Sequence, residues 1–192
     1  MKRLIIISGG IGVGKSSVSL ALVNSVVNSV FLDGDYCCQQ GDEWIFDDDT
    51  KKLALDSIVY VLKNHFKNRA FENIVFCWPL HKVEDFIFIK ESIVKLYTDV
   101  EVNEFSLVAK DNILYERISE RCKMRAKSNN SLVDDKNILQ LYEGALKQQD
   151  LLKCRAECII DTSNKSLDEI VDIIIDKLNL KKSKKKQMIL RK

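Results

Sequence analysis

The chain has 192 residues, of which 46% are hydrophobic and 30% charged, with a single proline and seven glycines. This composition is typical of one globular domain that buries a core. No apolar run reaches the roughly 18 to 20 residues that a membrane-spanning helix needs. The apolar stretch at the N-terminus runs into a glycine-rich motif and not into a cleavage site, so we expect a first strand and neither a signal peptide nor a membrane partner.

The net charge of +2 is unevenly distributed. The last twelve residues, KKSKKKQMILRK, contain seven Lys or Arg and no acid, which leaves 23 basic and 28 acidic side chains in the rest of the chain. An excess of acids over most of the chain disfavours nucleic acid as a partner. We expect residues 1–180 to form one domain and residues 181–192 to form a flexible basic tail.

Six cysteines are present, and two of them, Cys37 and Cys38, are adjacent. Their spacing includes no CxxC pair, so it does not indicate a zinc site. Without an export signal we expect reduced thiols and a cytoplasmic protein.

Strand and helix patterns alternate along the chain. Apolar runs typical of buried strands occupy residues 4–8, 30–32, 73–78, 104–108 and 157–160. Amphipathic spacing predicts helices over residues 17–27, 50–66, 83–97, 112–122, 136–154 and 167–178. Continuously apolar strands, each followed by a helix, predict an α/β fold with a parallel sheet covered on both faces.

Two segments, residues 36–49 and 123–134, interrupt this alternation. The first is polar and aromatic without a clear period, and the second is basic and then turn-like. Ligands of open α/β sheets bind where the chain leaves the carboxyl ends of the strands. Both segments are therefore candidates to cover a site.

The strongest motif is GGIGVGKS at residues 9–16, a complete GxxxxGK[ST] between a predicted strand and a predicted helix. Its backbone N–H groups and the helix N-terminus suit the phosphates of a nucleoside triphosphate. We expect Lys15 to reach the β- and γ-phosphates and the Ser16 hydroxyl to ligate Mg²⁺, so ATP and Mg²⁺ are the predicted cofactors. The nucleotide-binding residues predicted from this motif are Gly9, Gly10, Ile11, Gly12, Val13, Gly14, Lys15, Ser16 and Ser17.

Two other classes of P-loop protein fit poorly. A motor-type ATPase has an aspartate at the end of a second apolar strand, whereas the strand at residues 73–78 ends in Cys77 and Trp78. A guanine-selective GTPase has Asn-Lys-x-Asp after a strand, whereas here Asp168 comes one position too late after Asn164.

Asp33 and Asp35 end the strand that follows the first helix, and that end of the sheet faces the P-loop. Side chains two apart on an extended segment point the same way. We expect one carboxylate to hold hydrated Mg²⁺ and the other to orient and deprotonate an acceptor hydroxyl. The alternative is a solvated Asp-Gly turn with Asp33 as its cap.

The P-loop followed by FLDGD at residues 31–35 resembles the gluconate kinase and shikimate kinase group of small P-loop kinases. The resemblance continues in DDDTKK at residues 47–52, in NIVFC at residues 73–77, and in LVA at residues 107–109 followed by Leu114, Arg117 and Arg121. It covers most of residues 1–180 and is weaker beyond residue 80.

The resemblance implies a three-layer P-loop fold with a five-stranded parallel sheet of order 2-3-1-4-5. It also implies a substrate-binding region at about residues 36–66 and a lid at about residues 121–134. Asp33 would then assist the metal and Asp35 would contact the acceptor. Arg121 and Arg125 would act from the lid on the transferred phosphoryl group, with Arg117 one helical turn before Arg121. The adenine would lie near Asn164.

The chain departs from these kinases on the acceptor side. Tyr36 and the residues after it replace the His-Pro segment of gluconate kinases, and CWPL at residues 77–80 replaces the glycine turn of shikimate kinases. Few arginines are available there for a carboxylated substrate. A planar group stacked on aromatic side chains fits better. The aromatic candidates for substrate contact are Tyr36, Trp44, Phe46 and Trp78.

The prediction is thus a phosphotransferase that moves the γ-phosphoryl group of ATP to a hydroxyl or phosphate of a small molecule. A nucleoside or nucleotide kinase, an antibiotic-modifying kinase and a non-catalytic ATP-binding regulator stay open, as does the choice between monomer and homodimer. His65 and His81 are expected on helices at the surface or as caps, without a catalytic role.

Overall fold

The computed structural model describes residues 1–40, 45 and 47–183. Five strands and seven helices alternate along these residues. The strands are β1 (Lys2–Gly9), β2 (Ser29–Asp33), β3 (Asn73–Cys77), β4 (Val100–Val108) and β5 (Ile159–Asp161). The helices are α1 (Lys15–Ser25), the short 3-10 helix η1 (Gly34–Cys37), α2 (Asp48–Lys67), α3 (Val83–Val94), α4 (Asp111–Ser128), α5 (Asp135–Arg155) and α6 (Leu167–Leu178).

The strands form one parallel sheet in the order β2-β3-β1-β4-β5, which confirms the predicted strand order. β1 is central, since Ile5 lies beside Val75 of β3 and Asn103 of β4. Because its neighbours on both sides are hydrogen-bonded strands, β1 is long, apolar and fully buried over residues 4–9.

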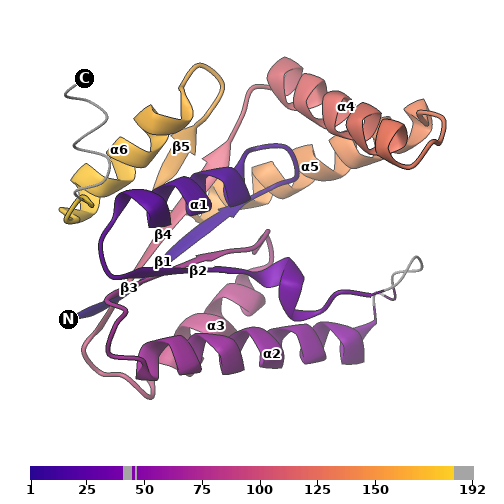
Figure 1. The fold of residues 1–192 in the computed structure, drawn as a ribbon. Coiled ribbons are helices and arrows are strands. Elements are labelled where there is room, and N and C mark those ends of the chain that lie inside the picture. Colours follow the sequence, from indigo (N-terminus) through magenta and orange to yellow (C-terminus); the bar gives the residue numbers. More distant parts are fainter. Residues whose placement is uncertain (41–44, 46, 184–192) are drawn as a thin grey trace.

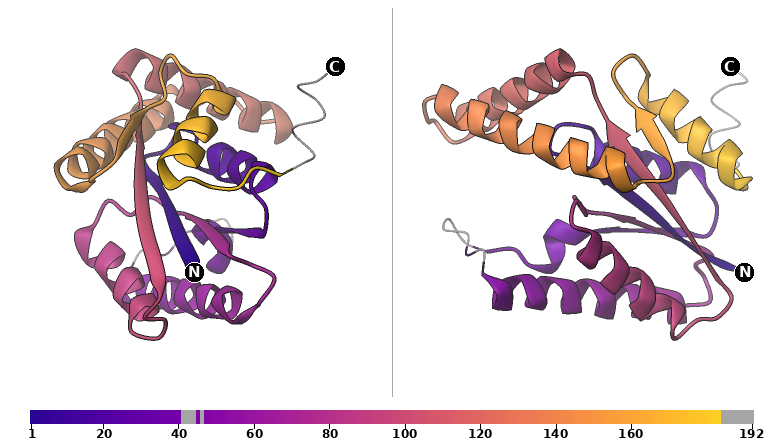
Figure 2. Two further views of the ribbon diagram at one scale, coloured as in Figure 1. Left: turned by 90° about the vertical axis from the view of Figure 1, so that its left-hand side faces the viewer. Right: turned by 180° about the vertical axis from the view of Figure 1, so that it is seen from behind.

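Helices cover both faces of the sheet (Figures 1 and 2). Ile5 and Ile7 of β1 pack into a core with α1, α4, α5 and α6, whereas Leu4 and Ile6 pack on the opposite face against α2 and α3. The alternation follows from the two-residue period of a strand. The P-loop lies at the carboxyl edge of the sheet, between β1 and α1.

The second predicted break in the alternation is shorter than expected. α4 continues to Ser128, so residues 123–128 are helical and the connection to α5 comprises residues 129–134. Lys, Arg, Met and Ala are strong helix formers. Because most residues of this stretch are charged or polar, it lacks the regular apolar spacing from which a helix is predicted. Ala126 is its one buried residue and packs the extended helix onto the protein. Residues 121–128 of the segment predicted as a lid are thus helical.

Residues 181–183, the start of the predicted basic tail, contact the end of α1 and α6. The Val27 N–H donates to the Lys181 carbonyl at 3.1 Å and the Ser183 N–H donates to the Ser25 carbonyl at 2.8 Å. Lys182 pairs with Asp172 of α6 at 2.8 Å. Residues 184–192 lie outside the described residues. Within the described part of the chain, no helix combines the length and apolar character needed to cross a membrane.

Candidate functional site

The P-loop begins where β1 ends and closes on the first turn of α1. Gly14 caps α1 in the left-handed region, with φ 98° and ψ 18°. A residue with a side chain is strained there, which explains the glycine before the Lys-Ser pair. Val13 is buried under the loop, and the exposed Ser16 and Ser17 start the helix. A helix N-terminus with free N–H groups suits an anion.

Lys15 lies across the loop, and its Nζ donates to the Gly10 carbonyl at 2.9 Å. Burial lowers the pKa of Lys15, whereas the nearby Cys77, Asp35 and Asp33 raise it. The ammonium group therefore sits between an apolar environment and two carboxylates. Phosphate oxygens are a natural partner for a cation placed in this way.

Ser16 and Asp33 meet at the ends of α1 and β2. The Ser16 hydroxyl donates to Oδ2 of Asp33 at 2.8 Å. Oδ1 of Asp33 accepts the Asp35 N–H at 3.2 Å, so this residue also caps η1. Asp33 therefore combines the two predicted roles. Its Oδ1 caps the turn, and its Oδ2 lies at Ser16, where Mg²⁺ was predicted.

Cys77 occupies the place at the end of β3 where the motor-type ATPases have an aspartate. Its Sγ lies 3.8 Å from Oγ of Ser16. Burial and the nearby Asp33 raise the pKa of the Cys77 thiol to about 12, so the thiol stays neutral at physiological pH. Asp33 is therefore the acid beside Ser16 in this protein.

Asp35 does not lie on an extended segment, which corrects the prediction that the two aspartates point the same way. β2 ends at Asp33, and Gly34–Cys37 is a 3-10 turn. The turn sends the Asp35 carboxylate toward Trp78, whose Nε1 donates to Oδ1 of Asp35 at 3.1 Å. Asp33 thus accepts from Ser16 and Asp35 accepts from Trp78, while both carboxylates raise the pKa of Lys15.

A pocket of about 420 Å³ opens beside the P-loop, and we call it the P-loop pocket. Its lining includes Lys15, Ser16 and Ser17 from the P-loop side, with Arg117 and Arg121 from α4 opposite. Arg117 donates from Nη1 to Oγ1 of Thr162 at 2.8 Å and from Nη2 to the Thr162 carbonyl at 3.0 Å. α4 is thereby tied to the loop after β5.

The other predicted residues of this region divide into two groups. Arg121 lines the P-loop pocket, and burial together with the nearby Arg125 lowers its pKa. Arg125 is exposed one turn further along α4 and is not among the described residues lining the pocket. Asn164 is exposed too, and Thr162 and Lys165 line the pocket on either side of it. The roles of Arg125 and Asn164 stay predictions.

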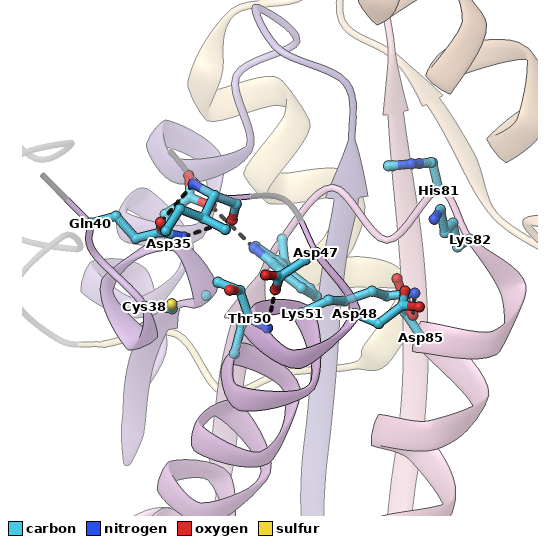
Figure 3. Close-up of a pocket in the computed structure, with 14 residues that line it drawn as sticks. Asp35, Cys38, Gln40, Asp47, Asp48, Thr50, Lys51, His81, Lys82 and Asp85 are labelled. Atoms are coloured by element: carbon cyan, nitrogen blue, oxygen red, sulfur yellow. Dashed lines mark hydrogen bonds and ion pairs between the residues drawn. The ribbon is translucent and has the colours of Figure 1, made fainter. Parts of the chain in front are cut away.

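A second pocket of about 340 Å³ has Asp35 in its lining, and we call it the Asp35 pocket (Figure 3). Lys51 of α2 and Asp85 of α3 form an ion pair of 2.7 Å at its wall. Asp85 is buried, with 11% of its side chain exposed. The described residues lining the pocket are Gly34, Asp35, Cys38, Gln40, Ile45, Asp47, Asp48, Thr50, Lys51, Ala54, Trp78, His81, Lys82 and Asp85.

Several residues of the Asp35 pocket were not predicted from the sequence. His81 lines the Asp35 pocket, although it was expected at the surface or as a cap. Burial and the nearby Lys82 lower its pKa, so its imidazole is neutral at pH 7. Lys51 belongs to the DDDTKK segment at residues 47–52, and the family resemblance of this segment could have indicated Lys51 as a site residue. Asp85 has no such signal, because only the packing of α3 on α2 brings it to Lys51.

The predicted aromatic residues do not form one cluster. Trp78 lines the Asp35 pocket. Tyr36 is 72% exposed and lies on a different, shallow groove beside Tyr60 of α2. Trp44 and Phe46 lie outside the described residues. Stacking of a planar acceptor in the Asp35 pocket therefore rests on Trp78.

The oxygen atoms at Ser16 and Asp33 fit a magnesium ion. Mg²⁺ is bound by one or two protein oxygens together with phosphates and water, and not by a cage of many side chains. Among the described residues, no group of three or more His, Cys, Asp or Glu side chains is arranged so that it could hold a metal ion. The 2.8 Å contact shows that both oxygens reach one point beside Lys15.

The strand order, the phosphate loop and the lysine, serine and aspartate around it define a P-loop nucleotide-binding fold of the small-kinase type. A family profile described as an AAA domain matches residues 5–138, more than half of the chain, and the chain belongs to this family. No curated protein sequence matches the chain significantly.

Solved structures share this fold over nearly the whole chain. The tunicamycin resistance protein of Deinococcus radiodurans is 15% identical with a TM-score of 0.64, covering 95% of this chain and 99% of that one. A gluconokinase from Sinorhizobium meliloti is 21% identical with a TM-score of 0.62, covering 88% and 87%. A shikimate kinase from Acinetobacter baumannii, solved with shikimate, is 17% identical with a TM-score of 0.57, covering 93% of both chains. The resemblance to gluconate and shikimate kinases is confirmed at the level of the fold.

Proposed function

We propose that this protein is an ATP- and Mg²⁺-dependent phosphotransferase that acts on a hydroxyl group of a small molecule. The observation that carries the proposal is that Asp35 lines one pocket and interacts electrostatically with two cations that line the other. Its carboxylate lines the Asp35 pocket and also acts on the charges of Lys15 and Arg121 at the P-loop pocket. A group that must take a proton from an acceptor and face a transferred phosphoryl group needs this position.

On the nucleotide side, the residues around the P-loop bind and orient ATP. The loop N–H groups and Lys15 hold the β- and γ-phosphates, and Arg117 with Thr162 borders the base. Ser16 and Asp33 would hold Mg²⁺, which when bound neutralises phosphate charge and aligns the γ-phosphoryl group.

On the acceptor side, Asp35 orients the attacking hydroxyl. The hydroxyl oxygen forms a bond to the γ-phosphorus as the bond from that phosphorus to the β,γ-bridging oxygen breaks, ADP leaves, and the hydroxyl proton passes to Asp35. Arg121, with Arg125 in support, stabilises the charge on the transferred group. Catalysis of this kind depends on positioning and electrostatics, and the residues around the two pockets supply both.

The described residues lining the Asp35 pocket include no arginine. Lys51 is paired with Asp85, and the four aspartates of the described lining outnumber its two lysines, Lys51 and Lys82, so the pocket disfavours a carboxylated or phosphorylated acceptor. We infer a neutral hydroxyl compound with an apolar or planar part that contacts Trp78.

The test is a phosphotransfer screen over sugar acids, shikimate, nucleosides, nucleotides, and aminoglycoside-, phenicol- and tunicamycin-like drugs. Lys15→Ala and Asp35→Asn are expected to abolish transfer while leaving the fold intact. Asp56→Asn, on the exposed side of α2, is the matched control and should retain full activity. Full activity of Asp35→Asn with a true acceptor would rule out its role as the base. ATP binding without transfer to any acceptor would favour a regulatory protein.

A further inference from the structure

The loop between β3 and α3, residues 78–82, supplies one wall of the Asp35 pocket. Trp78, His81 and Lys82 of this loop line the pocket. Its backbone bonds to β1 are long, with 3.4 Å from the Trp78 N–H to the Ile7 carbonyl and 3.5 Å from the Gly9 N–H to the Pro79 carbonyl. Hydrogen bonds at this distance are weak, so they do not fix the wall by themselves.

Leu80, in the middle of the loop, has an unfavourable backbone conformation. Four non-glycine residues in the described part of the chain have positive φ, and three of them are asparagines, which tolerate it. The fourth is Leu80, with φ 43°. A leucine held in this region is strained and persists only where its surroundings impose the conformation. The Leu80 side chain is 2% exposed, so it cannot move freely to relieve the strain.

Arg155, the last residue of α5, holds this loop. Its Nη2 donates to the Leu80 carbonyl at 3.1 Å. Its guanidinium group also forms a two-pronged ion pair with Glu104 of β4, one bond being 2.9 Å from Nη1 to Oε2. The guanidinium carbon lies 4.4 Å from the ring centre of Phe86 in α3. One side chain thus joins α5, the central part of the sheet, α3 and the strained loop.

The partners of this arginine make it rigid. The side chains of Arg155 and Glu104 are 12% and 9% exposed. Glu104 also accepts from the Ser8 hydroxyl at 2.9 Å, and Ser8 lies 2.6 Å from Ser106, so the pair is anchored to β1 and β4. A planar guanidinium group that is bonded to Glu104 by two hydrogen bonds and packs on the Phe86 ring has little rotational freedom.

α5 also touches the P-loop. A Cβ atom on Gly10 would lie 3.1 Å from the Ala145 carbonyl of α5, so the helix backbone packs directly against the loop. The same helix therefore contacts the P-loop near its middle and the wall of the Asp35 pocket at its end.

We propose that Arg155 is a positioning residue that sets the wall of the Asp35 pocket by holding the Leu80 carbonyl. It acts through the loop on Trp78 and His81 and does not touch the reacting groups. The proposal rests on the proposed function only for the use of this pocket by an acceptor. The position of the loop itself can be measured without any acceptor.

The experiment uses Trp78 as a reporter. Trp44→Phe leaves Trp78 as the single tryptophan of the chain. In this parent, Arg155→Met removes the contact but leaves Glu104 buried and unpaired, which endangers folding. Arg155→Met with Glu104→Gln removes the unpaired charge and keeps an acceptor for Ser8. The matched control is Lys153→Met, since Lys153 is in the same last turn and pairs with Asp150 at 3.5 Å on the surface.

The measurements are acrylamide quenching of Trp78, thermal unfolding and ATP affinity. For the double variant we expect the Trp78 quenching constant to rise about two-fold or more, because the loop at residues 78–82 loses its contact with Arg155. We expect ATP affinity to stay within about two-fold of the parent, because the contacts of the P-loop are unchanged. Lys153→Met should match the parent in all three.

An unchanged quenching constant in the folded double variant would overturn the proposal. Failure of the double variant to fold would also overturn it, because Arg155 would then serve the fold as a whole. With an acceptor found in the screen, the acceptor KM should rise while the ATP KM stays constant. Absence of transfer in the unmodified protein would count against the proposed function and leave the Trp78 result valid.

Discussion

Trp78 donates a hydrogen bond from its Nε1 to Oδ1 of Asp35 at 3.1 Å, and this contact orients the carboxylate in the lining of the Asp35 pocket. The donor comes from the loop after β3 and the acceptor from the 3-10 turn after β2. Trp78 therefore holds Asp35 at the pocket where we propose that the acceptor hydroxyl binds.

Trp78→Phe tests this contact. Phenylalanine retains a ring beside Gly34 but has no donor for Asp35. Since a hydrogen bond to a charged group contributes about 1.5 to 3 kcal/mol, we expect kcat/KM for phosphotransfer to fall about ten-fold or more. ATP affinity should stay unchanged, and Trp44→Phe is the control for loss of a tryptophan. Equal kcat/KM in Trp78→Phe and the unmodified protein would mean that Asp35 is oriented by other groups.

Gly34→Ala tests the same contact from the other side. A Cβ atom on Gly34 would lie 2.7 Å from two ring carbons of Trp78, so the ring has to move. We expect a loss of about 1 to 3 kcal/mol in the free energy of unfolding and a shifted Trp78 emission. The control is Gly144→Ala in α5, where the added Cβ meets nothing within 4 Å and helix propensity predicts a gain of up to about 1 kcal/mol. Denaturant unfolding of both variants distinguishes steric displacement from a general effect of alanine.

The parts of the site that were predictable from the sequence are those made by neighbouring residues. The P-loop needs a strand, a few glycines and a helix in direct succession, and Lys15 and Ser16 follow from the motif itself. Asp33 follows from the strand after the first helix. In each case the local pattern and the fold class together fix the position.

The parts that were not predictable depend on partners far apart in the chain. Trp78 and Asp35 are 43 positions apart, and Arg155 and Glu104 are 51 apart. Nothing in the local sequence shows that Leu80 adopts a positive φ or that Arg155 reaches its carbonyl. The segment with Asp33 and Asp35 was predicted as extended because it continues the apolar run of residues 30–32. The structure instead shows the alternative, a turn at Gly34–Cys37 that Asp33 caps.

Removal of the Asp33 carboxylate should weaken magnesium binding. Asp33 accepts from Ser16 at 2.8 Å, and loss of a carboxylate that orients a metal ligand typically costs on the order of 10- to 100-fold in metal affinity. For Asp33→Asn we expect ATP affinity to fall in the presence of Mg²⁺ and to change little in EDTA. Calorimetric titration in both conditions measures the difference. An equal loss in both would point to a fold defect, and Asn24→Ala serves as the control at an exposed position of α1 that does not line the P-loop pocket.

Arg121 should act mainly on the rate of transfer. It lines the P-loop pocket and its guanidinium interacts with Asp35. Arginines that stabilise a transferred phosphoryl group contribute on the order of 10³-fold or more to kcat, so Arg121→Ala should lower kcat by this order while ATP affinity falls far less. Arg125→Ala should have a smaller effect, and Lys123→Ala on the exposed side should have none. Single-turnover kinetics with saturating ATP measures the step, and a normal kcat in Arg121→Ala would remove it from the catalytic residues.

The lowered pKa of His81 predicts that the free energy of unfolding decreases at acidic pH. Burial and Lys82 lower its pKa below the ordinary value of 6.5, against the opposing effect of Asp85. Below about pH 6.5 the unfolded chain therefore binds a proton at this residue that the folded chain does not, and the free energy of unfolding decreases as the pH falls. His81→Gln removes this difference, so its free energy of unfolding should decrease less between pH 7.5 and pH 5.5 than that of the unmodified protein. His65, whose pKa is also lowered by burial, should behave in the same way in His65→Gln. Urea unfolding at the two pH values measures this difference. An unaltered decrease in His81→Gln would show that the His81 imidazole of the unmodified protein binds a proton equally in the folded and unfolded states.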